Sequence, residues 1–388
     1  MTPTPTRFVD LDSSATTPVS ERVLAAMLPW FREIYANPGS PSKAGERARE
    51  AVAESRSHLA AFLGADPREI ILTGGATESN QSAIRSALRA RPERRTLLVS
   101  SVEHSSILGL ASVLEGEGVK VVTIPAGRDG RIDPLEVARR VDSKTALVAV
   151  MWVNNETGAL NPVAEIAEIA REAGALFLTD AVAAAGKVPI DLSQVQADFL
   201  SLSAHKFYGP KGIGALFVRK GTEFFPLLPG SQERRRRGGT ENVPGIVGLG
   251  EAARESREFL VDGPGRLSAL GTRLEEGLRS LDLQGVRNGP ESDLFRAPHI
   301  VNMRFSRTPG EKVLIELGRE GIGVSMGSAC SAGSMEPSHV LLAMGLTREE
   351  AMRSVRFSLG REASSCDIDR TIEALGRILE TNEQRRVS

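Results

Sequence analysis

The chain has 388 residues, with 48 lysine and arginine residues against 49 aspartate and glutamate residues, so its formal net charge is −1. This balance argues against a generally polybasic protein that binds nucleic acid or a membrane surface, and the length predicts two or three domains. Only two cysteines occur, Cys330 and Cys366, which argues against a disulfide framework and favours a reducing, cytoplasmic compartment.

At the N-terminus, residues 1–7 lack the apolar stretch of a secretory signal, and no apolar run is long enough to span a bilayer. Apolar or β-branched runs then alternate with helical patterns. Strands are predicted at 69–73, 96–100, 119–124, 146–150, 175–179, 198–202 and 214–218. Helices are predicted between them at 77–89, 104–116, 134–141 and 162–173. This alternation predicts an α/β fold with a mostly parallel sheet covered on both faces, in which one of the last two strands can run antiparallel.

The alternation stops near Gly221, where a loop rich in glycine and arginine begins. A long helix is predicted at 243–260, and the Asp-Gly-Pro-Gly sequence at 262–265 predicts a domain boundary. The elements predicted beyond it are helices at 266–281, 310–319 and 367–379 and strands at 299–304 and 354–359. The C-terminal part therefore reads as a smaller α+β unit, with which the first residues of the chain could also pack.

Three polar features follow strands of the predicted sheet, where ligands of open α/β sheets bind. The turn at 74–77 opens a helix, and its free amides suit a phosphate. Asp180 closes the fifth strand, and His205 and Lys206 follow the sixth. Each feature alone fits a plain structural role, as a helix cap or a solvated side chain. Together they predict pyridoxal phosphate, which needs a lysine, an acidic partner for its ring nitrogen and a seat for its phosphate.

Cys330 is surrounded by small residues throughout 325–334, a composition that predicts a mobile loop with an accessible thiol. The alternative is an inert buried cysteine, as is common for free thiols. The arginine run at 234–237 could suggest contact with nucleic acid. Because the run is short and the overall charge is balanced, we expect no direct nucleic-acid binding.

The segment 203–212, Ser-Ala-His-Lys-Phe-Tyr-Gly-Pro-Lys-Gly, resembles the cofactor-lysine segment of cysteine desulfurases, which are fold-type I pyridoxal phosphate enzymes of the class-V aminotransferase group. Other segments that resemble family motifs are 11–18, 75–80, 102–104, 154–158, 237–242, 327–330 and 353–358. The Gly-Ser-Ala-Cys form resembles the NifS/IscS-like group. The resemblance implies a large cofactor domain at 15–262 with a mostly parallel seven-stranded sheet. It also implies a smaller α+β domain, made of 1–14 and 263–388, that carries the cysteine loop.

The resemblance also implies roles for single residues. Lys206 would bind the cofactor covalently and move protons with help from His104, while Cys330 would take the substrate sulfur as a persulfide. The residues that this family pattern assigns to cofactor binding are Ala76, Thr77, His104, Asn155, Asp180, Ser203, His205, Lys206 and Thr240. Thr240 would reach the cofactor phosphate of the other subunit, which makes a homodimer obligatory. Asn37, Asn155 and Arg356 would bind the substrate amino acid, and no metal is expected.

The implied reaction converts L-cysteine to L-alanine and passes sulfur to an acceptor protein, such as an iron–sulfur scaffold or a thiolation enzyme. One departure from the family pattern is Ala183, where a glutamine usually donates to the phenolic oxygen of the cofactor. The alternatives are therefore a selenocysteine lyase, another class-V enzyme, or a catalytically weak protein that keeps the fold for binding or regulation.

Overall fold

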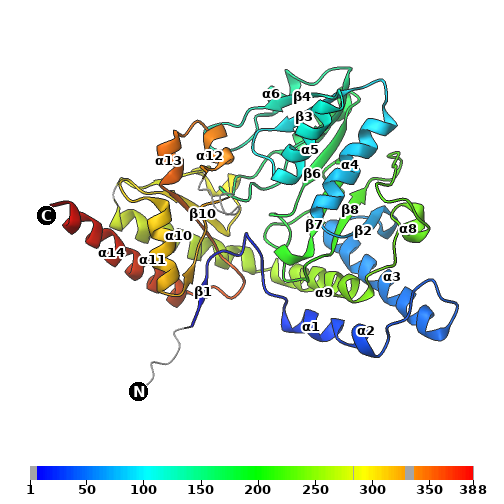
Figure 1. Cartoon of the computed structure of the whole chain (residues 1–388), viewed down its shortest axis with the longest axis horizontal. Helices are drawn as coiled ribbons and strands as arrows, with labels where there is room; N and C mark the ends of the chain where they lie inside the picture. Colours follow the sequence, from blue (N-terminus) through cyan, green and yellow to red (C-terminus); the bar gives the residue numbers. More distant parts are fainter. Residues whose placement is uncertain (1–6, 283, 328–335, 388) are drawn as a thin grey trace.

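The computed structural model describes residues 7–282, 284–327 and 336–387, so that Cys330 lies outside the described residues (Figure 1). Its largest sheet has seven strands in the order β2-β8-β7-β6-β5-β3-β4. The strands are β2 (Ile70–Thr73), β3 (Thr96–Ser100), β4 (Lys120–Ile124), β5 (Thr145–Ala149), β6 (Leu176–Asp180), β7 (Phe199–Ser203) and β8 (Gly214–Val218). Six strands of this sheet run in the same direction, and β8 runs opposite to them, antiparallel to both β2 and β7. The predicted mostly parallel sheet is confirmed.

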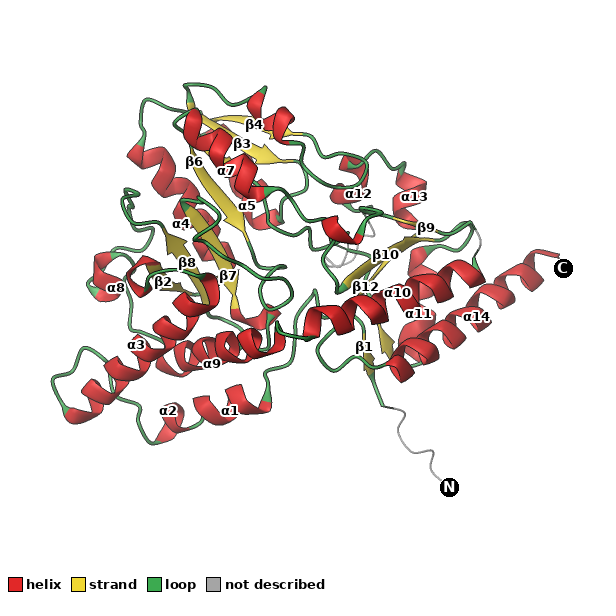
Figure 2. Ribbon diagram, turned by 180° about the vertical axis from the view of Figure 1, so that it is seen from behind, coloured by secondary structure: helices red, strands yellow, loops and turns green. Residues whose placement is uncertain are grey.

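Apolar side chains cover both faces of this sheet, because successive residues of a strand point to opposite sides. Leu97 packs with α4 (Ala76–Ala90) and α5 (Ser105–Gly116), whereas its neighbour Leu98 belongs to the core on the other face. The helices of that other face are α3 (Lys43–Leu63), α7 (Val163–Glu172) and α9 (Val243–Phe259). Figure 2, seen from behind, shows α7 over the strands. The shorter helices α1 (Glu21–Met27), α2 (Pro29–Arg32), α6 (Pro134–Ala138) and α8 (Gln232–Arg235) lie at the margins.

A second apolar core is built around a three-stranded antiparallel sheet in the order β12-β10-β9. Its strands are β9 (Val286–Arg287), β10 (Ile300–Arg304) and β12 (Ser354–Ser358), and its helices are α10 (Gly263–Leu281), α11 (Gly310–Arg319) and α14 (Ser365–Val387). The predicted breaker at 262–265 forms the first turn of α10. A proline is tolerated there because the first amides of a helix have no partner within the helix.

The start of the described chain joins this second core. β1 (Val9–Asp10) pairs in parallel with β11 (Ile322–Gly323), and Val9 and Leu11 are buried in the second apolar cluster. In contrast, Val340 and Leu341 of α12 (His339–Ala343) pack into the core of the large sheet, next to α13 (Arg348–Met352). The division into 15–262 and 1–14 with 263–388 stays a prediction.

Residues 11–17, which we call the N-terminal strap, connect the two cores by backbone hydrogen bonds. The amide of Ser13 donates to the carbonyl of Ser358 over 3.1 Å, and the amide of Thr17 donates to the carbonyl of His205 over 2.8 Å. The strap thus contacts β12 at one end and the turn after β7 at the other. No helix within the described ranges is long and apolar enough to cross a membrane.

Candidate active site

A cavity of about 1190 Å³ opens where the carboxyl ends of the central strands meet the N-terminal strap and β12. The predicted site residues that line it are Ala76, Thr77, His104, Asn155, Asp180, Ser203, His205, Lys206 and Arg356. Asn37 and Thr240, both described and both exposed, are not among its lining residues. Cys330 lies outside the described residues, but Gly327 and His339, which precede and follow its segment, both line the cavity.

One end of the cavity offers a seat for an anion. The N-cap of α4 is Gly75, with φ 147° and no capping side chain, so the first amides of the helix remain available. A Cβ atom at Gly214 would lie 2.7 Å from the Cα of Gly75, so glycine permits this close approach of β8. Ser203 lines the same end. Free helix-terminal amides beside a hydroxyl fit a phosphate group.

Asp180 ends β6 as a buried carboxylate whose two oxygens are both hydrogen-bonded. Asn80 donates from its Nδ2 atom over 2.9 Å, and the amide of Val182 donates over 3.0 Å. The sequence motif 75–80 contained Asn80, but its role as the partner of Asp180 was not predicted. The two donors fix the orientation of the carboxyl group at the end of β6, where it can face the pyridine nitrogen of the cofactor.

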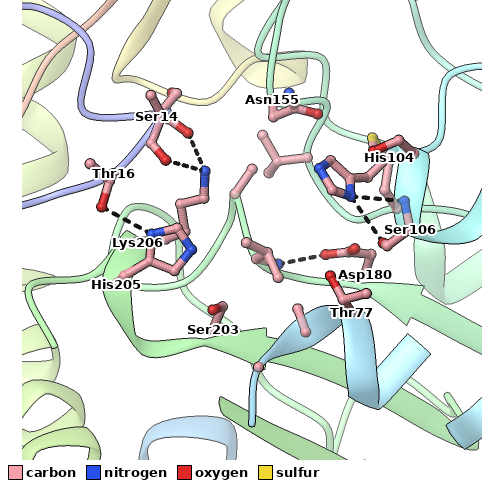
Figure 3. Close-up of a pocket in the computed structure, with 18 of the residues that line it drawn as sticks. Ser14, Thr16, Thr77, His104, Ser106, Asn155, Asp180, Ser203, His205 and Lys206 are labelled. Carbon is pink, nitrogen blue, oxygen red and sulfur yellow. Dashed lines mark hydrogen bonds between the residues drawn. The ribbon is translucent and has the colours of Figure 1, made fainter. Parts of the chain in front are cut away.

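Lys206 follows β7 in a short helical turn, and its Nζ atom donates to two carbonyls of the N-terminal strap (Figure 3). The distances are 2.5 Å to Ser14 and 2.8 Å to Ala15. Burial lowers the pKa of Lys206 to about 8, and the nearby charge of Arg356 acts in the same direction. The amine is therefore neutral more often at physiological pH than an ordinary lysine, and a neutral amine can act as a nucleophile or base.

The two predicted histidines differ in their contacts. His104 caps α5, with its Nδ1 atom accepting from the amide of Ser106 over 3.1 Å, which leaves the proton of a neutral ring on Nε2. Burial lowers its pKa. His205 lies 3.0 Å from the Thr16 hydroxyl, and burial lowers its pKa to about 4, so its ring is neutral at physiological pH. His104 is thus both a helix cap and a cavity residue.

At the other end of the cavity, Arg356 of β12 is buried and held by two partners. Its Nη2 atom lies 2.7 Å from Asp12 of the strap, and its Nη1 atom donates to the carbonyl of Asn155 over 3.0 Å. Such fixed guanidinium geometry suits the binding of a carboxylate. Asp12 was not predicted, although it lies in the singled-out motif 11–18, because its partner is 344 positions away.

Two buried glutamates, also not predicted, support the walls of the site. Glu103 accepts from the amide of Met151 over 2.7 Å, and burial raises its pKa to about 8. Glu156 accepts a hydrogen bond from Ser338, and a Cβ atom at Gly327 would lie 2.8 Å from its Cδ atom. Glu156 therefore contacts the chain on both sides of segment 328–335.

Tyr208, two residues after Lys206, has φ 70°, a left-handed conformation that is unusual for a bulky residue. Its hydroxyl accepts from the backbone amide of Arg361. The guanidinium of Arg361 lies 4.4 Å and the ammonium of Lys187 lies 4.9 Å from the centre of its ring. Tyr208 thus connects the lysine turn to the segment that follows β12.

Comparisons with known proteins match nearly the whole chain. The family model for aminotransferase class-V matches residues 9–371. Cysteine desulfurase 2 of Trichormus variabilis is 44% identical over 95% of this chain and 92% of its own length. Cysteine desulfurase NifS of Azotobacter vinelandii is 42% identical over 96% of this chain and 92% of its own. A solved NifS-like protein has a TM-score of 0.90 at 33% identity, covering 97% of this chain and 100% of that one.

Proposed function

This chain belongs to the class-V aminotransferase family as a pyridoxal-phosphate-dependent cysteine desulfurase, and from that premise we propose that its reaction takes place in the cavity around Lys206. The observation that carries the proposal is that one cavity combines an amine of lowered pKa, a buried carboxylate, an anion seat and a guanidinium. These are the groups that the cofactor and an amino-acid substrate require.

The residues fit the cofactor. The amides of Ala76 and Thr77, with Ser203, would hold its phosphate, and Asp180 would pair with its ring nitrogen. Lys206 would hold it covalently before the substrate binds. When bound, pyridoxal phosphate supplies a sink for the electron pair that remains when the α-proton of the substrate leaves.

The remaining steps are proposed for groups of the chain. Arg356 binds the substrate carboxylate, and Lys206, once free, takes the proton from the α-carbon. The thiolate of Cys330 attacks the substrate sulfur, so that a sulfur–sulfur bond forms while the Cβ–sulfur bond breaks. The electron pair of the broken bond stays with the carbon, which takes up a proton and becomes the methyl group of alanine. Neutral His104 can supply a proton from Nε2. The products are L-alanine and a persulfide on Cys330, and no external oxidant is needed.

The chain provides a matched control for this assignment, because Cys366 is its other cysteine. We expect Cys330→Ala to abolish persulfide formation and Cys366→Ala to leave it intact. Mass spectrometry of the peptide around residue 330 should show the gain of one sulfur atom after incubation with L-cysteine. Alanine release by Cys330→Ala at the wild-type rate would show that another group is the nucleophile.

The homodimer is part of the proposal. Asn37 and Thr240 have predicted roles but do not line the cavity of their own chain, which fits action in the site of a second copy. Exposed apolar side chains on and next to α1 and α2 offer a surface for that copy: Leu24, Leu28, Phe31 and Tyr35. If this surface forms the dimer, sedimentation should show the wild type as a dimer and the Leu28→Glu/Phe31→Glu variant as a monomer. An unchanged dimer in the variant would contradict it.

L-Cysteine is the substrate, and sulfur passes to an acceptor protein. We place the acceptor among iron–sulfur scaffolds and thiolation enzymes, and the enzyme in the cytoplasm. The scarcity of cysteines supports that compartment. Capture of partners on the persulfide-loaded enzyme would identify the acceptor, with Cys330→Ala as the control. Rates with L-cysteine and L-selenocysteine would distinguish a desulfurase from a selenocysteine lyase.

A further inference from the structure

The wall of the cavity around Arg356 contains buried polar atoms that have no hydrogen-bond partner within the described chain. These atoms are Ser13 Oγ, Ser14 Oγ, Lys187 Nζ, His299 Nδ1 and Arg356 Nε. Lys187 and His299 are each 2% exposed, and Arg356 is 4% exposed. All of them line the cavity, and each can donate a hydrogen bond. We call Lys187, His299 and Arg356 the basic cluster.

The side chains of the basic cluster influence one another electrostatically. The charges of Lys187 and Arg356 lower the pKa of His299 further, in addition to the larger effect of burial. Burial also lowers the pKa of Lys187 to about 7, with Arg361 acting in the same direction. The pKa values of His299 and Lys187 are lowered because a positive charge loses its hydration when it is buried, and an anion bound nearby would compensate for that loss.

The acidic groups of the surroundings do not neutralise the cluster. Asp10 and Glu362 act on Lys187 electrostatically, but neither forms an ion pair with it among the described residues. Asp12 is paired with the Nη2 atom of Arg356, which leaves the Nε atom free. The Tyr208 ring offers Lys187 a cation–π contact at 4.9 Å, which satisfies none of its donors.

Buried charges in proteins are normally paired, because an unpaired one loses its hydration without compensation. A cluster of donors that faces the active-site cavity can regain that compensation from an anionic ligand. A carboxylate matches it well, since its two oxygens accept several hydrogen bonds and its charge complements the cations.

We propose that Lys187 and His299, with the Nε edge of Arg356, form a subsite that binds a small carboxylate beside the position proposed for the substrate. The subsite rests on the proposed function only in sharing its cavity. The carboxylate has two possible sources. It belongs to the amino acid in the active site, or it is a free carboxylate ion bound next to that amino acid.

Calorimetric titration of the holoenzyme with sodium formate tests the subsite. We expect Lys187→Met to weaken formate binding by about tenfold or more, because hydrogen bonds to charged groups contribute strongly to affinity. The matched control is Lys211→Met, which removes an exposed lysine of the same cavity. Its formate affinity should stay close to that of the wild type.

Repeating the titration with saturating L-alanine distinguishes the two sources. Formate that still binds is a free ion in its own position. Formate that alanine displaces shows that the subsite takes the carboxylate of the amino acid, and Lys187→Met should then raise the KM for cysteine more than it lowers kcat. Equal formate affinities of the wild type and Lys187→Met, together with an unchanged KM, would overturn the proposal.

Other readouts separate this inference from the proposed function. The proposed function is tested by the visible absorption of the bound cofactor and by the persulfide on Cys330. The subsite is tested separately by the heat of formate binding. Thermal unfolding shows whether Lys187→Met is folded, and Lys187→Gln, which keeps a polar head, is a second variant. A His299→Leu variant that binds formate like the wild type would remove His299 from the subsite.

Discussion

The two ends of the cavity are built in different ways. The phosphate end consists of backbone amides and short polar side chains on the central sheet and α4, and both oxygens of Asp180 have donors there. The substrate end is made by longer side chains that come from the strap, from β12 and from the loops between the cores. It holds buried donors that have no partner among residues 7–282, 284–327 and 336–387. The carboxylate of Asp180 thus has both of its donors within one chain, whereas the donors of the substrate end need a ligand to satisfy them.

The largest effect should come from the end of the cavity that contains Asp180. Asp180→Asn removes the charge that would hold the ring nitrogen protonated, so alanine formation should fall roughly hundred- to thousandfold in a steady-state assay. The comparison variant Asn80→Ala keeps the carboxylate of Asp180 but loses one hydrogen bond to it. Its rate of alanine formation should fall roughly tenfold. Equal losses in the two variants would show that the charge of Asp180 is not the important property.

At the substrate end, Arg356→Gln should raise the KM for cysteine roughly tenfold to hundredfold, because the variant cannot make a charged contact with the carboxylate. Asp12→Asn retains the guanidinium but weakens its support, so its KM should rise only severalfold. A larger KM effect of Asp12→Asn than of Arg356→Gln would indicate that the carboxylate is bound elsewhere.

Ala183 lines the cavity without a donor side chain. Introducing the donor with Ala183→Gln should shift the visible absorption of the bound cofactor and change kcat severalfold. Very slow turnover by the wild type that Ala183→Gln restores would favour the catalytically weak alternative. Efficient turnover by the wild type would exclude that alternative.

The last prediction concerns stability and pH. Burial lowers the pKa of Lys187 to about 7, far below its value in an unfolded chain. Between these two values the unfolded state binds more protons, so the free energy of unfolding should rise with pH from about 7 to about 10. The slope from this group is at most about 1.4 kcal/mol per pH unit. In urea unfolding, the free energy of unfolding of the wild type should increase with pH relative to that of Lys187→Met. The same pH dependence in both proteins would contradict the prediction.

Local signals in the sequence predicted several elements and the strand ends that carry Asp180 and Lys206. Strand β8 and helix α11 have the predicted bounds, and the strand ends that carry Asp180 and Lys206 were found from short apolar runs. In contrast, α3 was not predicted, despite its Ser42 cap and the left-handed Gly64 at its end. Its buried face is made partly of glycine, alanine and serine, so its apolar pattern is weak.

The substrate end was harder to predict because its contacts join distant parts of the chain. Asp12 and Arg356 lie in two separate motifs, and nothing local to either motif predicts their pairing. Lys187 and His299 carry no motif signal at all, since what distinguishes them is burial without a partner. The positions of Asn37 and Thr240 outside the cavity likewise depend on tertiary structure.

The N-terminal strap has a consequence for biosynthesis. Residues 11–17 are synthesised long before β12, yet the amide of Ser14 donates a hydrogen bond to the hydroxyl of Ser358, which follows 344 residues later in the chain. The central sheet can assemble while translation continues, but the carbonyls that hold Lys206 reach their final place only after β12 has emerged from the ribosome. The vitamin-derived coenzyme can therefore meet its finished pocket only once β12 has been synthesised.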